Sequence, residues 1–118
     1  MKNQSAKAKG RKFQQWCRDL LLKHAPVLTS DDVRSTSMGA GGEDILLSTA
    51  ARAIYPWTVE CKAQERLNIW KAWQQAVENR PVEVLEPIVF ITRNRQEPLV
   101  VMRAGFFMNE RYKITEEE

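Results

Sequence analysis

The sequence Gly-Gly-Glu-Asp-Ile-Leu-Leu at residues 41–47 is followed, across one short connection, by Val-Glu-Cys-Lys at residues 59–62. Both segments set acidic side chains inside apolar stretches, which predicts one strand over residues 44–49 and another over residues 57–63. Because side chains alternate between the two faces of a strand, Glu60 and Lys62 share a face. If the two strands are neighbours, Asp44 stands beside Glu60. The two segments therefore predict a sheet that carries two carboxylates and an ammonium on one face.

The segments that flank these strands predict an α/β fold. Ahead of them, the apolar residues have the spacing of one helical face, which indicates a helix that begins near residue 10 and ends before residue 26. These apolar residues are Phe13, Trp16, Cys17, Leu20 and Leu21. A short polar strand is expected over residues 31–37, and a glycine-rich loop over residues 38–42.

The second half of the chain predicts one more helix and two more strands. Residues 65–79 lack Gly and Pro and place their apolar mass on one side, including Trp70 and Trp73, as a packed helix does. Residues 87–92 and 98–102 are rich in β-branched and aliphatic side chains, and a polar turn over residues 93–97 separates them. The expected order is α-β-β-β-α-β-β, which gives a mixed five-stranded sheet flanked by helices.

The composition is that of an ordinary soluble domain. The chain has 118 residues, of which 43% are hydrophobic and 28% charged, so one domain is expected. No apolar run approaches the roughly 18 residues of a membrane span, and no secretory signal is recognisable, which indicates a cytoplasmic protein. Cys17 and Cys61 provide neither a disulfide framework nor a zinc cluster.

Charge is distributed unevenly along the chain, although the net charge is only +3. The first 12 residues hold five cations and no acidic residue, and three glutamates close the sequence. The expected organisation is a mobile basic arm over residues 1–9, a single domain over residues 10–113 and an acidic tail over residues 114–118. A cationic arm gains free energy on DNA by releasing counterions, whatever the base sequence. The cations that start the chain are Lys2, Lys7, Lys9, Arg11 and Lys12.

The carboxylate pair predicts a metal site. Two buried carboxylates raise each other's pKa unless a cation joins them, and Mg²⁺ prefers hard oxygen ligands; Mn²⁺ is expected to substitute. The backbone carbonyl of Cys61 lies between Glu60 and Lys62 and could supply a further oxygen. Lys62 could orient or help deprotonate a metal-bound water and contact a phosphate oxygen. This chemistry is phosphodiester hydrolysis. The alternative is a solvated strand face with a weak ion pair, which the glycine-rich loop before Asp44 disfavours.

Asp44 with Glu60-Cys61-Lys62 resembles the signature of the PD-(D/E)XK nucleases. Over residues 10–107 the chain resembles archaeal-type Holliday junction resolvases, especially short phage-encoded relatives. The likeness includes the helix that starts at Gly10-Arg11, the segment Val33-Arg34-Ser35 and the glycine-rich loop. It implies a restriction-endonuclease-like fold, and a homodimer that makes paired symmetric nicks in four-way DNA junctions and leaves 5′-phosphates. No membrane and no organic cofactor are implied.

The resemblance also implies roles for single residues. Asp44 and Glu60 become metal ligands, and Lys62 becomes the catalytic lysine. The family's helix glutamate is missing, because the corresponding stretch reads Phe13-Gln14-Gln15. A glutamine can still bind water without carrying charge, and Glu43 is a possible substitute although period two points it away from Asp44. The residues expected to contact the DNA backbone are Lys9, Arg11, Lys12, Arg34, Ser35, Ser37, Gln64 and Arg66.

Three other functions fit the same sequence. The protein could be a nuclease of the same superfamily that acts on forks, flaps or duplex DNA. It could be a DNA-binding recombination accessory protein without activity, which the missing helix glutamate favours. It could also be a partner-binding module, because Trp70 and Trp73 on a helix are more typical of a core or a dimer interface than of base stacking.

Overall fold

A five-stranded mixed sheet with the strand order β1-β2-β3-β4-β5 forms the centre of the molecule. The computed structural model describes residues 2–37 and 41–111. Strands β3 and β4 are parallel, and every other neighbouring pair is antiparallel. This confirms the predicted mixed sheet flanked by helices. The strands are β1 (Val33–Ser35), β2 (Ile45–Leu47), β3 (Trp57–Ala63), β4 (Glu86–Thr92) and β5 (Leu99–Val101).

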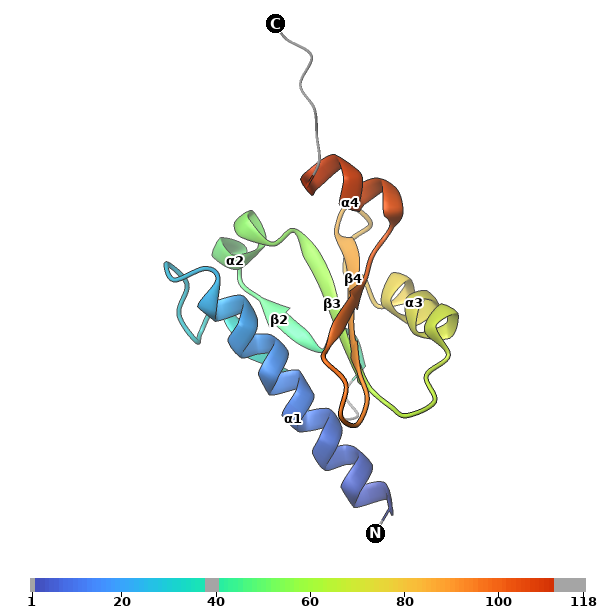
Figure 1. Cartoon of the computed structure of the whole chain (residues 1–118). Coiled ribbons are helices and arrows are strands. Elements are labelled where there is room, and N and C mark those ends of the chain that lie inside the picture. Colours follow the sequence, from blue (N-terminus) through green and yellow to red (C-terminus); the bar gives the residue numbers. More distant parts are fainter. Residues whose placement is uncertain (1, 38–40, 112–118) are drawn as a thin grey trace, which may run out of the picture.

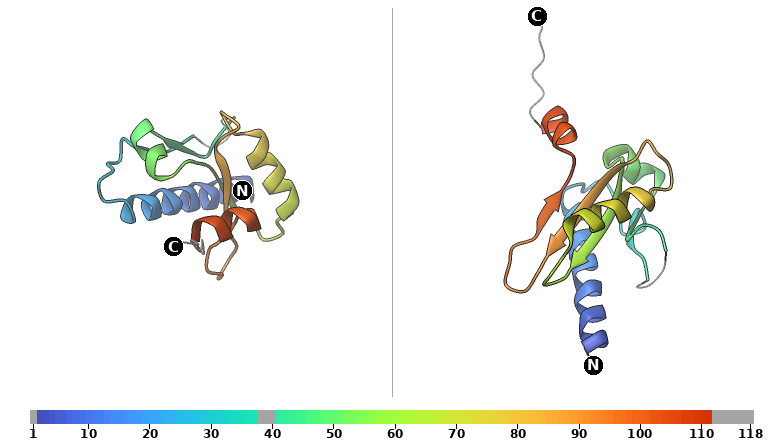
Figure 2. Two further views of the ribbon diagram at one scale, coloured as in Figure 1. Left: turned by 90° about the horizontal axis from the view of Figure 1, so that it is seen from above. Right: turned by 90° about the vertical axis from the view of Figure 1, so that its right-hand side faces the viewer.

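Helices cover both faces of this sheet (Figures 1 and 2). Helix α1 crosses one face, and α3 packs on the other as the crossover that parallel strands β3 and β4 require. The short helix α2 joins β2 to β3, and α4 follows β5 at one end of the sheet (Figure 1). The helices are α1 (Lys2–Lys23), α2 (Thr49–Ile54), α3 (Ile69–Glu78) and α4 (Ala104–Arg111).

The observed order, α-β-β-α-β-α-β-β-α, corrects the predicted order at two helices. Helix α2 has six residues and only one buried side chain, so it leaves no apolar period in the sequence. It begins because the Ser48 side chain accepts a hydrogen bond from the amide of Ala51. Helix α4 has exposed apolar side chains such as Met108, which give no amphipathic pattern. Strands β1 and β2 are also shorter than predicted.

The N-terminal end of α1 corrects a third expectation. Residues 1–9 were expected to have no regular structure, but α1 already begins at Lys2, so residues 2–9 form its first two turns. Lys, Gln and Ala are good helix formers, and they continue a helix that is anchored further along by packing. This part of α1 projects beyond the sheet (Figure 1). The acidic tail over residues 114–118 lies outside the described residues.

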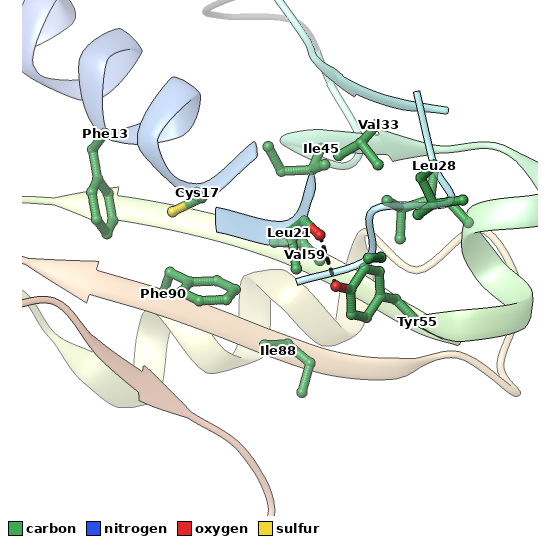
Figure 3. Packing of buried hydrophobic residues seen from close by; sticks show 13 residues of the cluster. Phe13, Cys17, Leu21, Leu28, Val33, Ile45, Tyr55, Val59, Ile88 and Phe90 are labelled. Atoms are coloured by element: carbon green, nitrogen blue, oxygen red, sulfur yellow. Dashed lines mark hydrogen bonds between the residues drawn. The ribbon is translucent and has the colours of Figure 1, made fainter. Parts of the chain in front are cut away.

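The main core lies between α1 and the sheet (Figure 3). Phe13, Cys17 and Leu21 of α1 point to the sheet, as their helical spacing predicts, and meet Ile88 and Phe90 of β4. The Tyr55 hydroxyl donates a hydrogen bond of 2.8 Å to the backbone carbonyl of Leu21, which ties the connection after α2 to α1. Trp16 departs from the predicted face, because 42% of it is exposed.

A smaller core lies on the opposite face of the sheet. Ala72 and Ala76 of α3 pack against Val89 of β4, and Trp73 packs against this cluster. Trp70 instead points away, with 81% of its surface exposed. None of the helices in the described part of the chain has the length and apolarity of a membrane span.

Candidate active site

Asp44 and Glu60 meet at the point where β2 begins beside β3. The two strands pair antiparallel with Ile45 opposite Val59, and the Asp44 amide donates a hydrogen bond of 3.2 Å to the Val59 carbonyl. The Asp44 carboxylate accepts a hydrogen bond of 2.8 Å from the Cys61 amide through Oδ2. The Asp44 and Glu60 carboxyl groups lie close enough together for each to influence the pKa of the other. The predicted neighbouring position of the two acidic side chains is confirmed.

These carboxyl groups line a cleft of about 450 Å³ together with Lys62. Helix α1 lines it with Ala6 and Gly10, strand β3 lines it with residues 60–63, and α3 contributes Gln75. The remaining lining residues are Gln14, Gly41, Gly42, Cys61, Ala63, Gln64, Gln75 and Asn79.

Burial raises the pKa of both carboxyl groups. Desolvation, followed by the charge of Asp44, raises the pKa of Glu60 to about 7. Desolvation also raises the pKa of Asp44, although the Cys61 amide and the Lys62 ammonium oppose this rise. Two acidic groups that resist losing their protons together form a site whose electrostatics favour an added cation.

Asn79 is a site residue that the sequence reasoning missed. Its side-chain amide donates a hydrogen bond of 3.0 Å to Glu60 Oε2, and the residue caps the C-terminus of α3. The donor lowers the pKa of Glu60 and so partly offsets burial. An asparagine at the end of a predicted helix, before Arg80-Pro81, marks a cap in the sequence. Its contact with Glu60 depends on how α3 packs, so no local pattern could have indicated it.

Gln14, and not Gln15, faces the cleft. The Gln14 side-chain amide donates to the backbone carbonyls of Asp44 at 2.6 Å and Thr36 at 3.0 Å, and to the Thr36 hydroxyl at 3.2 Å. The residue is 3% exposed and thus fixes α1 to the start of β2. Gln15 is exposed and lies on another side of α1.

Glu43 is not a substitute for the missing helix glutamate, which corrects that possibility. Its side chain is buried and forms an ion pair of 2.8 Å with Arg52 of α2. Arg52 also donates to the Trp57 carbonyl, so this pair fixes α2 to the start of β3. The residue points away from the Asp44 face, as the period-two argument indicated.

Four of the residues expected to contact DNA come together in a groove of about 610 Å³ between α1 and β1. Within residues 2–37 and 41–111, neither Arg11 nor Arg34 forms an ion pair, so both guanidinium groups are available for a ligand. Guanidinium and hydroxyl donors together suit phosphate oxygens. The groove is lined by Arg11, Gln15, Arg18, Arg34, Ser35, Thr36 and Ser37.

The other expected DNA contacts are spread around this region. Lys9 and Lys12 lie on a further side of α1, and Lys9 forms a distant ion pair of 3.8 Å with Glu65. Gln64 lines the cleft and also a neighbouring cavity along α3 that Lys62 and Lys71 share. Arg66 is exposed in the connection before α3.

The carboxylate pair fits a divalent cation of the Mg²⁺ type. Among the described residues there is no cluster of three or more His, Cys, Asp or Glu side chains that could hold a metal. Mg²⁺ does not need one, because it commonly binds one or two carboxylates and completes its shell with water and substrate phosphate. The Cys61 thiol contacts Cys17, and this contact and burial raise its pKa well above the ordinary value, so it stays protonated. Ligation by the Cys61 carbonyl remains a prediction.

Comparison with known proteins identifies no relative. No family model, no curated protein and no solved structure matches this chain. The resemblance to the PD-(D/E)XK nucleases therefore remains a prediction from the sequence.

Proposed function

We propose that the protein is a Mg²⁺-dependent endonuclease that hydrolyses DNA phosphodiester bonds, with four-way junctions as its preferred substrate. The observation that carries the proposal is the convergence of Asp44, Glu60 and Lys62 on one cleft, where burial raises the pKa of both carboxyl groups. A structural ion pair needs only one carboxylate, whereas two neighbouring carboxylates beside a lysine suit a site that binds a cation and a phosphate.

Each side chain of the cleft has a role in this proposal. Asp44 and Glu60 would hold the metal, and Asn79 and the Cys61 amide fix one oxygen of each carboxylate. When bound, Mg²⁺ supplies positive charge against the negative charge that develops on the phosphate. Lys62 would contact a phosphate oxygen and orient the attacking water. Gln14 acts as a positioning residue, because its bonds reach the Asp44 backbone.

The surroundings of the cleft support DNA as the substrate. The groove with Arg11 and Arg34 lies next to the cleft, on the other side of Gln14 and Thr36. Contacts of this kind bind the DNA backbone and carry no base sequence, as recognition of junction shape needs. The mixed sheet, with β3 and β4 parallel across α3, is compatible with the restriction-endonuclease-like fold that we propose. A homodimer is proposed because a junction needs two symmetric cuts, and residues 2–37 and 41–111 of one chain form one carboxylate cleft.

The direct test is cleavage of labelled four-way junction, fork and linear duplex in Mg²⁺. We expect nicks on the junction, and a loss of about 100-fold or more in Lys62→Ala and Glu60→Gln, because both variants remove groups that act on the reacting phosphate. Lys62→Ala should still bind the junction. Lys23→Ala is the matched control, since Lys23 is an exposed lysine at the far end of α1. Cleavage by Lys62→Ala at the wild-type rate would refute the assignment.

A DNA-binding protein without activity is the second candidate, and Gln14 favours it. The cleft has two carboxylates, and the amide in the third position is already bonded to backbone carbonyls. Tight junction binding with no metal-dependent cleavage of any of the three substrates would establish this candidate. Cleavage of all three at equal rates would keep the nuclease and discard its junction preference.

A further inference from the structure

A second cavity, of about 540 Å³, lies between α1 and the end of β4 that leads into the β4–β5 turn. It occupies a different side of α1 from the active-site cleft. The two cavities are neighbours, because Ala63 of β3 lines both. We call it the aromatic pocket. It is lined by Lys9, Lys12, Phe13, Gln15, Trp16, Asp19, Ala63, Glu65, Thr92, Arg93, Asn94 and Pro98.

The pocket contains a preformed aromatic stack. The rings of Phe13 and Trp16 are stacked, with centroids 5.8 Å apart and planes inclined by 16°. Phe13 is buried in the core, whereas 42% of Trp16 is exposed. Trp16 therefore presents indole surface to the cavity and is supported by its stacking on the buried Phe13 ring. A fixed, half-exposed aromatic ring is a surface on which another flat ring can stack.

The uncommitted charge of the pocket is positive. Its two acidic residues are already engaged. Asp19 pairs with Arg18 at 2.8 Å, and Glu65 accepts a hydrogen bond of 2.7 Å from the backbone N–H of Asn94 and lies 3.8 Å from Lys9. By contrast, Lys12 and Arg93 form no ion pair with any other residue in the described ranges. Both cations can therefore receive an anionic ligand.

We propose that the aromatic pocket binds one unpaired nucleobase of DNA, stacked on Trp16, with the adjoining phosphates against Lys12 and Arg93. An aromatic platform beside cations is the combination that binds single-stranded nucleic acid. A volume of about 540 Å³ is typical of sites for small ligands. This inference rests on the proposed function, since the cleft next to the pocket is where the cleaved phosphate would lie. It predicts that substrates with an unpaired nucleotide near the cut are favoured.

The test compares two exposed tryptophans. Trp16→Ala removes the platform, Trp16→Phe retains an aromatic ring, and Trp70→Ala is the matched control on α3. Affinity is measured in EDTA, so that no cleavage occurs, for oligo-dT, for a linear duplex and for the same duplex with a three-nucleotide bulge. We expect Trp16→Ala to lose about tenfold in affinity for oligo-dT and the bulged duplex, with the linear duplex unchanged. Trp16→Phe should recover most of this loss, and Trp70→Ala should match wild type.

A second variant guards against a folding defect in Trp16→Ala. The double variant Lys12→Gln/Arg93→Gln changes only exposed side chains. We expect it to reduce the slope of log affinity for oligo-dT against log salt concentration by about one to two. The double variant Lys23→Gln/Arg95→Gln also removes two exposed cations and should reduce this slope less. Equal losses of oligo-dT affinity in Trp16→Ala and Trp70→Ala would overturn the proposal that the aromatic pocket binds a base. An affinity of Trp16→Phe as low as that of Trp16→Ala would overturn it as well. So would failure of the wild type to bind oligo-dT.

The outcomes separate this inference from the proposed function. If the wild type cleaves junctions in Mg²⁺ but Trp16→Ala binds oligo-dT like wild type, the nuclease stands and the pocket is refuted. If the wild type cleaves nothing while Trp16→Ala loses its affinity for oligo-dT, the pocket stands and the nuclease is refuted.

Discussion

Glu60 illustrates how a single residue connects stability with the proposed activity. It is 1% exposed, it lies beside the Asp44 carboxyl group, and its pKa is raised to about 7. The folded chain therefore favours a proton on Glu60 or an added cation beside it. Such a residue lowers the stability of the empty protein at neutral pH. It is the kind of cost that functional sites tend to carry.

The first prediction concerns the pH dependence of folding without metal. Glu60 binds its proton more tightly in the folded chain, where its pKa is about 7, than at its ordinary value of 4.5. The folded state thus holds more protons than the unfolded state between these values, so the free energy of unfolding falls as pH rises. We expect Glu60 to lower it by up to about 3 kcal/mol between pH 4.5 and pH 8.

Urea unfolding in EDTA at several pH values tests this, with Glu60→Gln as the comparison. The glutamine cannot ionise, so the variant should lose most of the decline and be more stable than wild type at pH 8. Mg²⁺ should raise the stability of the wild type at pH 8 but have less effect on the variant. A wild-type stability that rises from pH 5 to pH 8 in parallel with the variant would contradict this explanation.

At the scale of elements, α1 organises everything around the cleft. Ala6, Gly10 and Gln14 face the cleft, Arg11 and Gln15 face the basic groove, and the aromatic pocket takes a further side of the same turns. Helix α1 is held against β1 and the start of β2 by the Gln14 amide. The position of α1 and that of Asp44 are therefore coupled.

The second prediction tests this coupling by Gln14→Glu, which restores the residue that the resemblance leads one to expect. A carboxylate in this place would face the carbonyl oxygens of Thr36 and Asp44, which now accept hydrogen bonds. We expect a loss of about 2 kcal/mol or more in unfolding free energy at pH 8, and no gain in cleavage. Gln15→Glu is the matched control, because this neighbour is exposed, and it should change stability by less than about 0.5 kcal/mol. An active, fully stable Gln14→Glu variant would contradict the role of the Gln14 hydrogen bonds in holding α1 against the start of β2.

The sequence predicted those features that depend on local periodicity. Alternation along residues 57–63 was enough to put Glu60 and Lys62 on one face, and apolar spacing was enough to place Phe13, Cys17 and Leu21 in the core. Helix α2 was not predicted, because a capped helix of six residues has no apolar stripe. The hydrogen bonds of Asn79 to Glu60 and of Gln14 to the Asp44 carbonyl were not predicted either. Their partners are 19 and 30 residues away, and such contacts depend on packing.

At the scale of the whole molecule, the surfaces proposed for DNA are gathered around residues 6–19 of α1. A DNA strand in the cleft would lie beside this helix, with cations on both sides. The described residues form one cleft with this carboxylate pair, so the proposed resolution of a junction requires two copies acting together. The central claim is thus that two such clefts cut one junction.

The most direct measurement of this claim uses a supercoiled plasmid that extrudes a cruciform, incubated with the protein and Mg²⁺. Two coordinated cuts across the cruciform linearise the plasmid, whereas isolated cuts only relax it to nicked circles. We predict that linear plasmid forms from the earliest times without a build-up of nicked circles, and that Lys62→Ala yields neither product. Accumulation of nicked circles alone, equal cleavage of a plasmid without the cruciform, or a fully active Lys62→Ala variant would contradict the account.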